Sequence, residues 1–155
     1  MTRIDIAFGR THLPVTLPAG AEARVIRKRD LPKLPDQRAA IRAALDKPID
    51  AKPLKALAAA TRSACILICD ITRPVPNHLF LRPLIERMLA AGIPRARITV
   101  LVATGLHRPN EGAELEALVG DPWVLATVRV ENHFARDAAA HADLGVTPGR
   151  NTPVR

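Results

Sequence analysis

Apolar and polar positions alternate over the first part of the chain. The alternation runs from residue 4 to residue 8 and again from residue 13 to residue 17, on either side of a turn that contains Gly9. A period of two residues is typical of a half-buried strand, so this stretch predicts an antiparallel hairpin. The segment 23–29, "ARVIRKR", is predicted to add a short strand.

Helical spacing replaces the alternation from residue 35 onward. The segment 35–48 has Asp36 as an N-cap, apolar positions three and four apart, and a proline at its end, which predicts a helix. A second short helix is predicted over 53–60. The segment 77–94 is also predicted to be helical, interrupted or kinked near Pro83 and ended by Gly92.

Continuous apolar runs mark the predicted sheet. The runs 64–70 and 97–105 do not alternate, as expected of parallel strands that are covered on both faces. A third strand is predicted over 124–133, after a short helix that Asn110 would cap. Strands that alternate with helices predict an α/β fold, here a parallel-sheet βαβ core with an N-terminal antiparallel hairpin, within one domain spanning 1–155.

Two cysteines, Cys65 and Cys69, occupy the first of these runs. At about 3.3 Å per residue their Cα atoms would lie about 13 Å apart, which is too far for a disulfide. We expect two small buried side chains. A metal-ligand role is not indicated, because no second Cys or His pair at zinc-like spacing accompanies them.

Composition argues against two classes of protein, those that bind nucleic acids and those that span a membrane. The 155 residues carry a net charge of +8, but the basic residues are scattered outside 24–30 and aromatic residues make up only 3%. Stacking platforms and DNA-binding patterns are missing, so nucleic-acid binding rests on charge alone. No apolar run approaches the roughly 20 residues of a membrane span, and the start lacks the pattern of a signal peptide, so a cytoplasmic location is expected.

Polar clusters follow each predicted strand. The first cluster contains Asp70, Thr72 and Arg73, the second is "ATGLHR" over 103–108, and the third is "ENH" over 131–133. In open α/β sheets, ligands bind beyond the carboxyl ends of the strands. Three clusters at one edge therefore predict a binding site for a small anionic molecule.

Residue type suggests a role for each member of the first two clusters. Arg73 offers a planar, permanently charged fork for a carboxylate or phosphate. Asp70 would hold that guanidinium or accept a ligand hydroxyl, or it is simply a turn or capping residue. Thr104 supplies a hydroxyl, Gly105 allows close approach of the backbone, and His107 can take up a proton near neutral pH, although many loop histidines are only surface residues.

The remaining histidines carry a weaker signal. His12 and His141 are expected to be solvated, and His78 is either a wall of the site or exposed. The pair Asn132-His133 either lines the crevice or forms a strand-end turn.

The two central clusters also resemble a known family. "DITRPVP" followed by "ATGLHRP", then "VENHFARD" and "LGVTPGRNTPV", is similar to the first half of the N-terminal domain of nickel-pincer-nucleotide-dependent lactate racemases and related 2-hydroxyacid racemases and epimerases. The resemblance implies hydride transfer from a hydroxy acid to the cofactor. It also implies that Arg73 binds the substrate carboxylate, Asp70 contacts cofactor or substrate, and His107 is one of two bases.

The resemblance is incomplete at its far end. The family's second base, the lysine that tethers the cofactor and the histidine that ligates nickel belong to later segments, which these 155 residues do not contain. The resemblance therefore implies an incomplete domain that is inactive alone and needs the C-terminal part of the protein or another chain. The alternative is a non-catalytic anion-binding or assembly module of the same fold. The sequence does not indicate which hydroxy acid is used or the oligomeric state.

Overall fold

The computed structural model describes residues 2–155. Contacts between residues divide the chain into two compact units, of which the first ends at Lys33 and the second spans Leu34–Arg155. The candidate site lies entirely in the second unit.

The first unit contains the predicted hairpin. Strands β1 (Arg3–Phe8) and β2 (Thr11–Thr16) pair antiparallel, with Phe8 opposite Thr11 beside the turn at Gly9. This confirms the antiparallel hairpin. The strand predicted over 23–29 is wrong: that segment pairs with no described strand, and its side chains are exposed. A basic segment that has no neighbouring strand to form hydrogen bonds with gains no stability from an extended conformation.

The second unit is built on a parallel sheet. Its strands β3 (Ala64–Cys69), β4 (Ile98–Ala103) and β5 (Arg129–Asn132) lie side by side in chain order. Helix α3 (Asn77–Ala90) connects β3 to β4, and helices α4 (Gly112–Val119) and α5 (Pro122–Thr127) connect β4 to β5. The predicted α/β class and parallel βαβ core are therefore confirmed.

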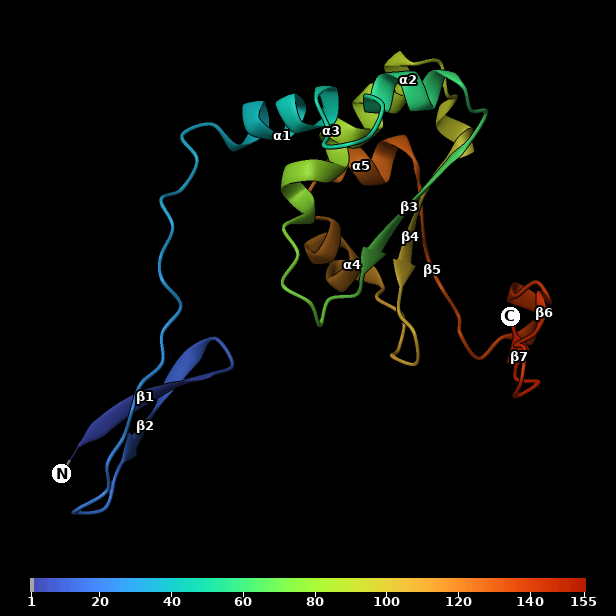
Figure 1. Cartoon of the computed structure of the whole chain (residues 1–155). Helices are drawn as coiled ribbons and strands as arrows, with labels where there is room; N and C mark the ends of the chain where they lie inside the picture. The colour runs from blue at the N-terminus through green and yellow to red at the C-terminus, as the bar shows by residue number, and fades with distance from the viewer. Residues whose placement is uncertain (1) are drawn as a thin grey trace. The chain divides into compact units, whose positions relative to one another are not determined.

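One face of this sheet forms the core. Alternate strand residues pack with the connecting helices, which lie on one side of β3–β5 in Figure 1. Helices α1 (Gln37–Asp46) and α2 (Leu54–Ala59) pack against α3, and the predicted N-cap Asp36 accepts a hydrogen bond from the backbone N–H of Ala39 at 2.8 Å. The fully buried aliphatic side chains of the core are Leu81, Ile85, Ile98, Val100, Val102, Val119 and Val124.

The opposite face of the sheet is open. Leu67, in the middle of β3, is 69% exposed, and its neighbours on that face, Cys65 and Cys69, are exposed as well. The prediction of a sheet covered on both faces, with buried cysteines, is therefore wrong. The prediction that the apolar run forms a parallel strand is confirmed. The second face of the sheet is exposed because every helix that joins these strands packs on the first.

Two further differences concern helices. The segment predicted as the start of the third strand folds as α5, because Asp121 caps its first turn by accepting from Trp123 N–H at 2.9 Å and Pro122 stands at the first helical position. The third strand, β5, begins only at Arg129. Helix α3 continues through Pro83, so of the two predicted alternatives, an interruption or a kink, the interruption is wrong.

Short elements complete the second unit. These are the 3₁₀ turns η1 (Arg95–Arg97) and η2 (Ala138–Ala140) and the two-residue antiparallel strands β6 (Gly145–Val146) and β7 (Pro153–Val154). Within residues 2–155, no helix has the length and apolar character needed to cross a lipid bilayer.

Gly120, which ends α4, has a backbone conformation and a close neighbour that make a larger residue destabilising. Its φ is +67°, and a Cβ added there would lie 2.8 Å from Cβ of His78. We expect Gly120→Ala to lower the free energy of unfolding by about 2–4 kcal/mol, since both the left-handed backbone and the overlap are unfavourable. Urea unfolding would measure this.

The matched control for Gly120→Ala is Gly112→Ala. Gly112 also has a positive φ, +53°, but an added Cβ would meet nothing within 4 Å. Its cost is expected to be only about 1–2 kcal/mol. An equal loss of unfolding free energy in the two variants would show that His78 moves away from the added Cβ at no cost.

Candidate active site

The three polar clusters follow neighbouring strands of the sheet. Cys69 at the end of β3 is in register with Ala103 at the end of β4, and Val102 is in register with Asn132 at the end of β5. Residues that follow these strands therefore begin at one edge of the sheet. This is the carboxyl edge, where α/β proteins bind ligands.

Asp70 is a buried acid at this edge, with only 4% of its surface exposed. Its Oδ1 accepts the Thr72 hydroxyl at 2.6 Å and the Thr72 backbone N–H at 3.3 Å. Its Oδ2 lies 2.5 Å from Nδ1 of His107. The structure thus joins Asp70, Thr72 and His107 in one hydrogen-bonded group.

The contact with Asp70 fixes the state of the His107 ring. An ionised carboxylate only accepts hydrogen bonds, so Nδ1 of His107 carries the proton and donates it to Asp70. In the neutral ring, Nε2 is then free to accept a proton. Because the His107 side chain is 54% exposed, a small molecule can reach it.

The same contacts keep Asp70 ionised. The hydroxyl of Thr72, followed by the imidazole of His107, holds the pKa of the Asp70 carboxyl below its usual value. A negative charge is therefore available beside Nδ1 when His107 takes up a second proton.

Thr104 and Gly105 shape the loop that carries His107. Thr104 is buried, its hydroxyl donates to the backbone carbonyl of His133, and its own carbonyl accepts the N–H of His107 at 3.0 Å. Gly105, inside this turn, has a φ of +57°. The loop is thus anchored to the segment after β5, and it directs His107 toward Asp70.

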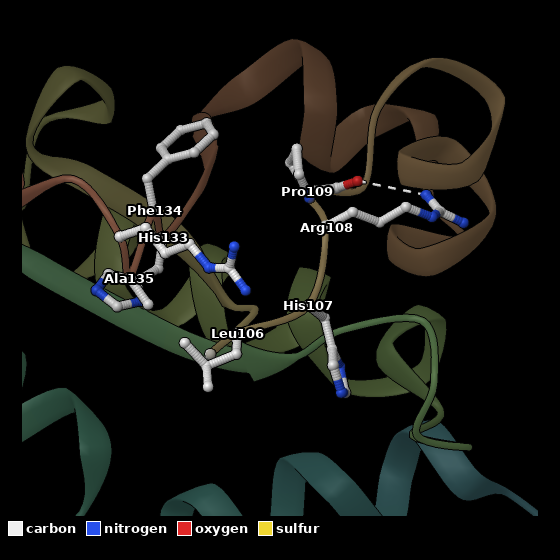
Figure 2. A pocket seen from close by; sticks show the side chains of 9 residues that line it. Leu106, His107, Arg108, Pro109, His133, Phe134 and Ala135 are labelled. Atoms are coloured by element: carbon white, nitrogen blue, oxygen red, sulfur yellow. Dashed lines mark hydrogen bonds between the residues drawn. The ribbon is translucent and has the colours of Figure 1, made fainter.

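A cavity of about 340 Å³ opens beside His107. It lies between the loop 105–109 and the segment 133–136, and it is lined by residues from both. Figure 2 shows Leu106 and His107 extending from the first segment, and His133 and Phe134 from the second. Arg136 contributes the cation on the second side, so a guanidinium and apolar surface line the cavity. The ring of His107 extends away from Pro109 and Phe134, at the margin of the cavity (Figure 2).

Arg73 lies apart from this arrangement. It is exposed in the turn after β3, where its backbone N–H donates to the Asp70 carbonyl at 3.1 Å. Within residues 2–155 its side chain has no hydrogen bond or ion pair to another residue, and it does not line the cavity beside His107. The carboxylate of Asp70 therefore contacts His107 and Thr72, not the guanidinium of Arg73.

Asn110 links all three strand ends, a role that the sequence did not reveal. It is almost fully buried, and its side-chain oxygen accepts the N–H of Ile71 at 3.2 Å. Its backbone N–H and carbonyl pair with the side chain of Asn132, each at 2.9 Å. The predicted capping role is wrong, because α4 begins after Glu111 and no side chain caps it. The only sequence signal was a polar residue directly after "HRP".

Glu114 extends this network to the surface. It receives both Nη atoms of Arg108, at 2.5 and 2.8 Å, and Nδ2 of Asn110 at 2.9 Å. These donors, Arg108 foremost, lower the pKa of Glu114 from 4.5 to about 2. A depressed pKa in the folded state stabilises the protein above pH 4.5, and this contribution disappears as the pH falls toward 2.

We therefore predict that Glu114→Gln flattens the acid limb of the stability curve. Between pH 4.5 and pH 2, the melting temperature of the variant should fall less steeply than that of the unmodified chain. The control is Glu116→Gln, an exposed change on the same helix. Parallel curves for Glu114→Gln and the unmodified chain would show that the Arg108 contact does not persist in solution.

His133 and His141 lie in contact, so the expectation that His141 is solvated is wrong: it is only partly exposed. Nε2 of His133 lies 2.9 Å from Nε2 of His141, whose Nδ1 donates to the carbonyl of Asp137 at 2.6 Å. Of the predicted pair Asn132-His133, His133 lines the cavity, whereas the side chain of Asn132 fixes the strand end by pairing with the backbone of Asn110. The hairpin residue His12 is exposed, and His78 lies against Gly120. Across residues 2–155, no three His, Cys, Asp or Glu side chains are arranged to hold a metal ion.

Comparison with known proteins gives a consistent result. The family model described as the lactate racemase N-terminal domain matches residues 8–155. The lactate racemase of Lactiplantibacillus plantarum is 36% identical over 104 residues, which cover 67% of this chain and 24% of that protein. The lactate racemase of Thermoanaerobacterium thermosaccharolyticum is 29% identical over 126 residues, covering 80% of this chain and 29% of that protein.

A solved structure extends the comparison to the fold. The lactate racemase apoprotein from Thermoanaerobacterium thermosaccharolyticum superimposes with a TM-score of 0.76 at 25% sequence identity. The superposition covers 98% of this chain but 34% of that one. The chain thus spans between about a quarter and a third of the length of these relatives.

Proposed function

Because this chain belongs to the lactate racemase N-terminal domain family, we propose that it forms part of a racemase or epimerase acting on lactate or another 2-hydroxy acid. The observation that carries the proposal is the contact between Asp70 and His107, which supplies an oriented base at the carboxyl edge of the sheet. An exposed ring nitrogen backed by a buried carboxylate is the arrangement that general-base catalysis uses.

The chemistry of His107 follows from this geometry. Oxidation of a 2-hydroxy acid to a keto acid requires removal of the hydroxyl proton, which Nε2 of His107 would accept. The imidazolium formed is stabilised by the charge on Asp70, 2.5 Å from Nδ1. The α-hydrogen would leave with its electron pair to the hydride acceptor that the cofactor of the complete enzyme would supply. Return of the hydride to either face of the keto acid's α-carbon, and of the proton to its oxygen, would complete a cycle in which the configuration can change.

The cofactor implied by the family is a nickel-pincer nucleotide, which supplies a hydride acceptor when bound. The described residues include no cluster of three metal-binding side chains, and the histidine that ligates nickel would come from a segment outside them. At the carboxyl edge of the sheet, the cations and hydrogen-bond donors of these residues suit the anionic groups of a cofactor or substrate. We propose that Thr72 and Gly105 contact cofactor or substrate and that Arg73 binds the substrate carboxylate from its exposed turn. Asp70 and Thr104, for which the sequence also suggested ligand contact, are buried, and we propose that they act by holding His107 and its loop in place.

The tether lysine, the nickel ligand and a second base would then come from segments outside these residues. On that view the isolated 155-residue chain does not racemise a hydroxy acid. A direct test is a chimaera in which this chain replaces the matched third of the Thermoanaerobacterium thermosaccharolyticum racemase. Interconversion of D- and L-lactate by the cofactor-loaded chimaera would support the proposal. A folded, loaded chimaera without activity on lactate or other 2-hydroxy acids would favour a non-catalytic module.

Arg73 provides a more specific prediction in the active chimaera. Lysine keeps the positive charge but loses the planar fork that binds a carboxylate through two hydrogen bonds. We expect Arg73→Lys to raise KM for the hydroxy acid about tenfold, the effect of losing one charge-assisted hydrogen bond, with a smaller change in kcat. Arg62→Lys, at an exposed position before β3, is the control. An unchanged KM in Arg73→Lys would remove Arg73 from the substrate site.

A further inference from the structure

The open face of the parallel sheet needs a physical explanation. Along β3 it presents Cys65, Leu67 and Cys69, and β4 adds Thr99, Leu101 and Ala103 beside them, so that its apolar part is centred on Leu67 and Leu101. Leu67 is 69% exposed. A contiguous apolar surface of this kind marks an interaction site, because exposed apolar area is unfavourable in water. Strands of a parallel sheet are usually covered on both faces.

The order of the strands explains why this face is open. The chain moves from β3 to β4 to β5 in one direction across the sheet, always through helices. Crossovers between parallel strands are right-handed, so connections that progress in one direction all lie on one face. Helices α3, α4 and α5 obey this rule, and α1 and α2 pack on the same side through α3. Only a crossover that progresses in the reverse direction covers the second face.

The free edge of β3 is where such a reversal would occur. Among the described strands, β3 pairs only with β4, so its other edge can accept a further parallel strand. A helix leading to that strand would cross the open face. The strand order would then reverse at β3, and ligands of doubly wound sheets bind at such a reversal point. Asp70, Thr72 and Arg73 stand directly after β3.

The rim of the open face indicates the character of the covering helix. A hollow of about 420 Å³ lies across the amino-terminal half of this face, and its lining includes Arg97, Arg129 and Glu131 as well as Cys65 and Leu101. Arg129 is partly neutralised by Glu131 at 3.1 Å, whereas Arg97 has no ion pair within residues 2–155. An apolar stripe with a basic rim fits an amphipathic helix that carries an acidic residue at one margin.

We propose that an amphipathic helix from the part of the racemase polypeptide outside these 155 residues covers this face and leads to a strand beside β3. The inference rests on the proposed function for the identity of the polypeptide. Its structural support is the open face and the free edge of β3. The solved relative has about two thirds of its length outside the region that superimposes on this chain, which is enough for such a helix and strand. The site would then lie at the reversal of the sheet, with Arg73 between the two halves.

The two cysteines on the open face provide the test. In the isolated chain, Cys65 and Cys69 should react with a maleimide at the rate of exposed thiols. In the chimaera with the Thermoanaerobacterium racemase, both should react at least tenfold more slowly, because labelling then requires local opening. The control is Lys47→Cys in the Cys65→Ser/Cys69→Ser background. Residue 47 ends α1, on the opposite side of the sheet, and should stay reactive in both proteins.

The outcomes separate the possible occupants. Slow labelling in the isolated chain at every concentration would show that the chain covers the face itself, for instance with its hairpin, and would overturn the proposal. Protection that increases with concentration would identify a second copy and would also overturn it. Cysteines that react as fast in a folded chimaera as in the isolated chain would also overturn the proposal. This readout needs no turnover, so protection without racemisation would refute the proposed function alone.

A second variant keeps the test informative if the chimaera does not fold. Leu67→Asp in the isolated chain should abolish binding of the dye anilinonaphthalene sulfonate and leave the melting temperature within about 2 °C, since the side chain is exposed. If the dye binding is unchanged or the chain unfolds, Leu67 is not part of an open apolar face and the proposal fails.

Discussion

Replacing His107 by glutamine in the active chimaera is expected to lower kcat by about 10²–10⁴-fold, the usual contribution of a general base. Glutamine preserves the size and polarity of the side chain but has no site that takes up a proton near neutral pH. His107 lies on a loop and its side chain is half exposed, so the melting temperature should change by only a few degrees. Single-turnover rates and thermal unfolding of the same preparations would measure both effects.

The control for His107→Gln is His12→Gln, an exposed histidine in the hairpin. It should retain full activity. If His107→Gln loses activity only in proportion to its loss of folded protein, the imidazole supports the loop and takes no part in proton transfer.

Asp70→Asn is expected to produce a loss of similar size by a different route. The asparagine amide can donate to Nδ1 of His107, which would place the ring proton on Nε2 and remove the free acceptor. It also removes the charge that stabilises the imidazolium. We expect kcat to fall by about 10²–10³-fold, since a general base without its carboxylate partner loses orientation and charge together.

The relation between the two variants is the sharper measurement. If Asp70 acts through His107, the double variant should be little slower than His107→Gln alone, because residues that act as a unit are not additive. Losses that multiply would show that Asp70 contacts cofactor or substrate independently. Thr72→Val removes the hydroxyl that donates to Asp70 at 2.6 Å. It should lower kcat less than Asp70→Asn does, because the carboxylate itself remains.

Local sequence patterns predicted most of the fold. The alternation in 4–17 identified the hairpin, and the continuous apolar runs identified β3 and β4, because each of these signals depends only on residues close together in the chain. The third strand was placed too early, since Asp121 and Pro122 start a helix that the apolar residues after them conceal. Which face of the sheet is covered depends on the direction of successive crossovers, and a period of apolar residues contains no such information.

The sequence indicated where the candidate site residues lie in the fold, but it did not indicate which of them contact each other. Strand ends placed Asp70, Thr72 and His107 at one edge of the sheet, although His107 lies 37 positions after Asp70 in the chain. The pairing of Asp70 with His107, and not with Arg73, depends on the turn geometry after β3 and β4. The role of Asn110 was missed because it arises from two partners, Ile71 and Asn132, that are distant in sequence.

The consecutive order of β3, β4 and β5 has a consequence for biosynthesis. Each strand pairs with the next one along the chain, so we expect this unit to assemble from its N-terminal end as the polypeptide leaves the ribosome, one crossover at a time. During that interval the surface around Leu67 would be exposed to other nascent chains. The charged side chains of Arg97, Arg129 and Glu131 at its margin would then act as gatekeepers against aggregation, which gives them a use before any substrate is bound.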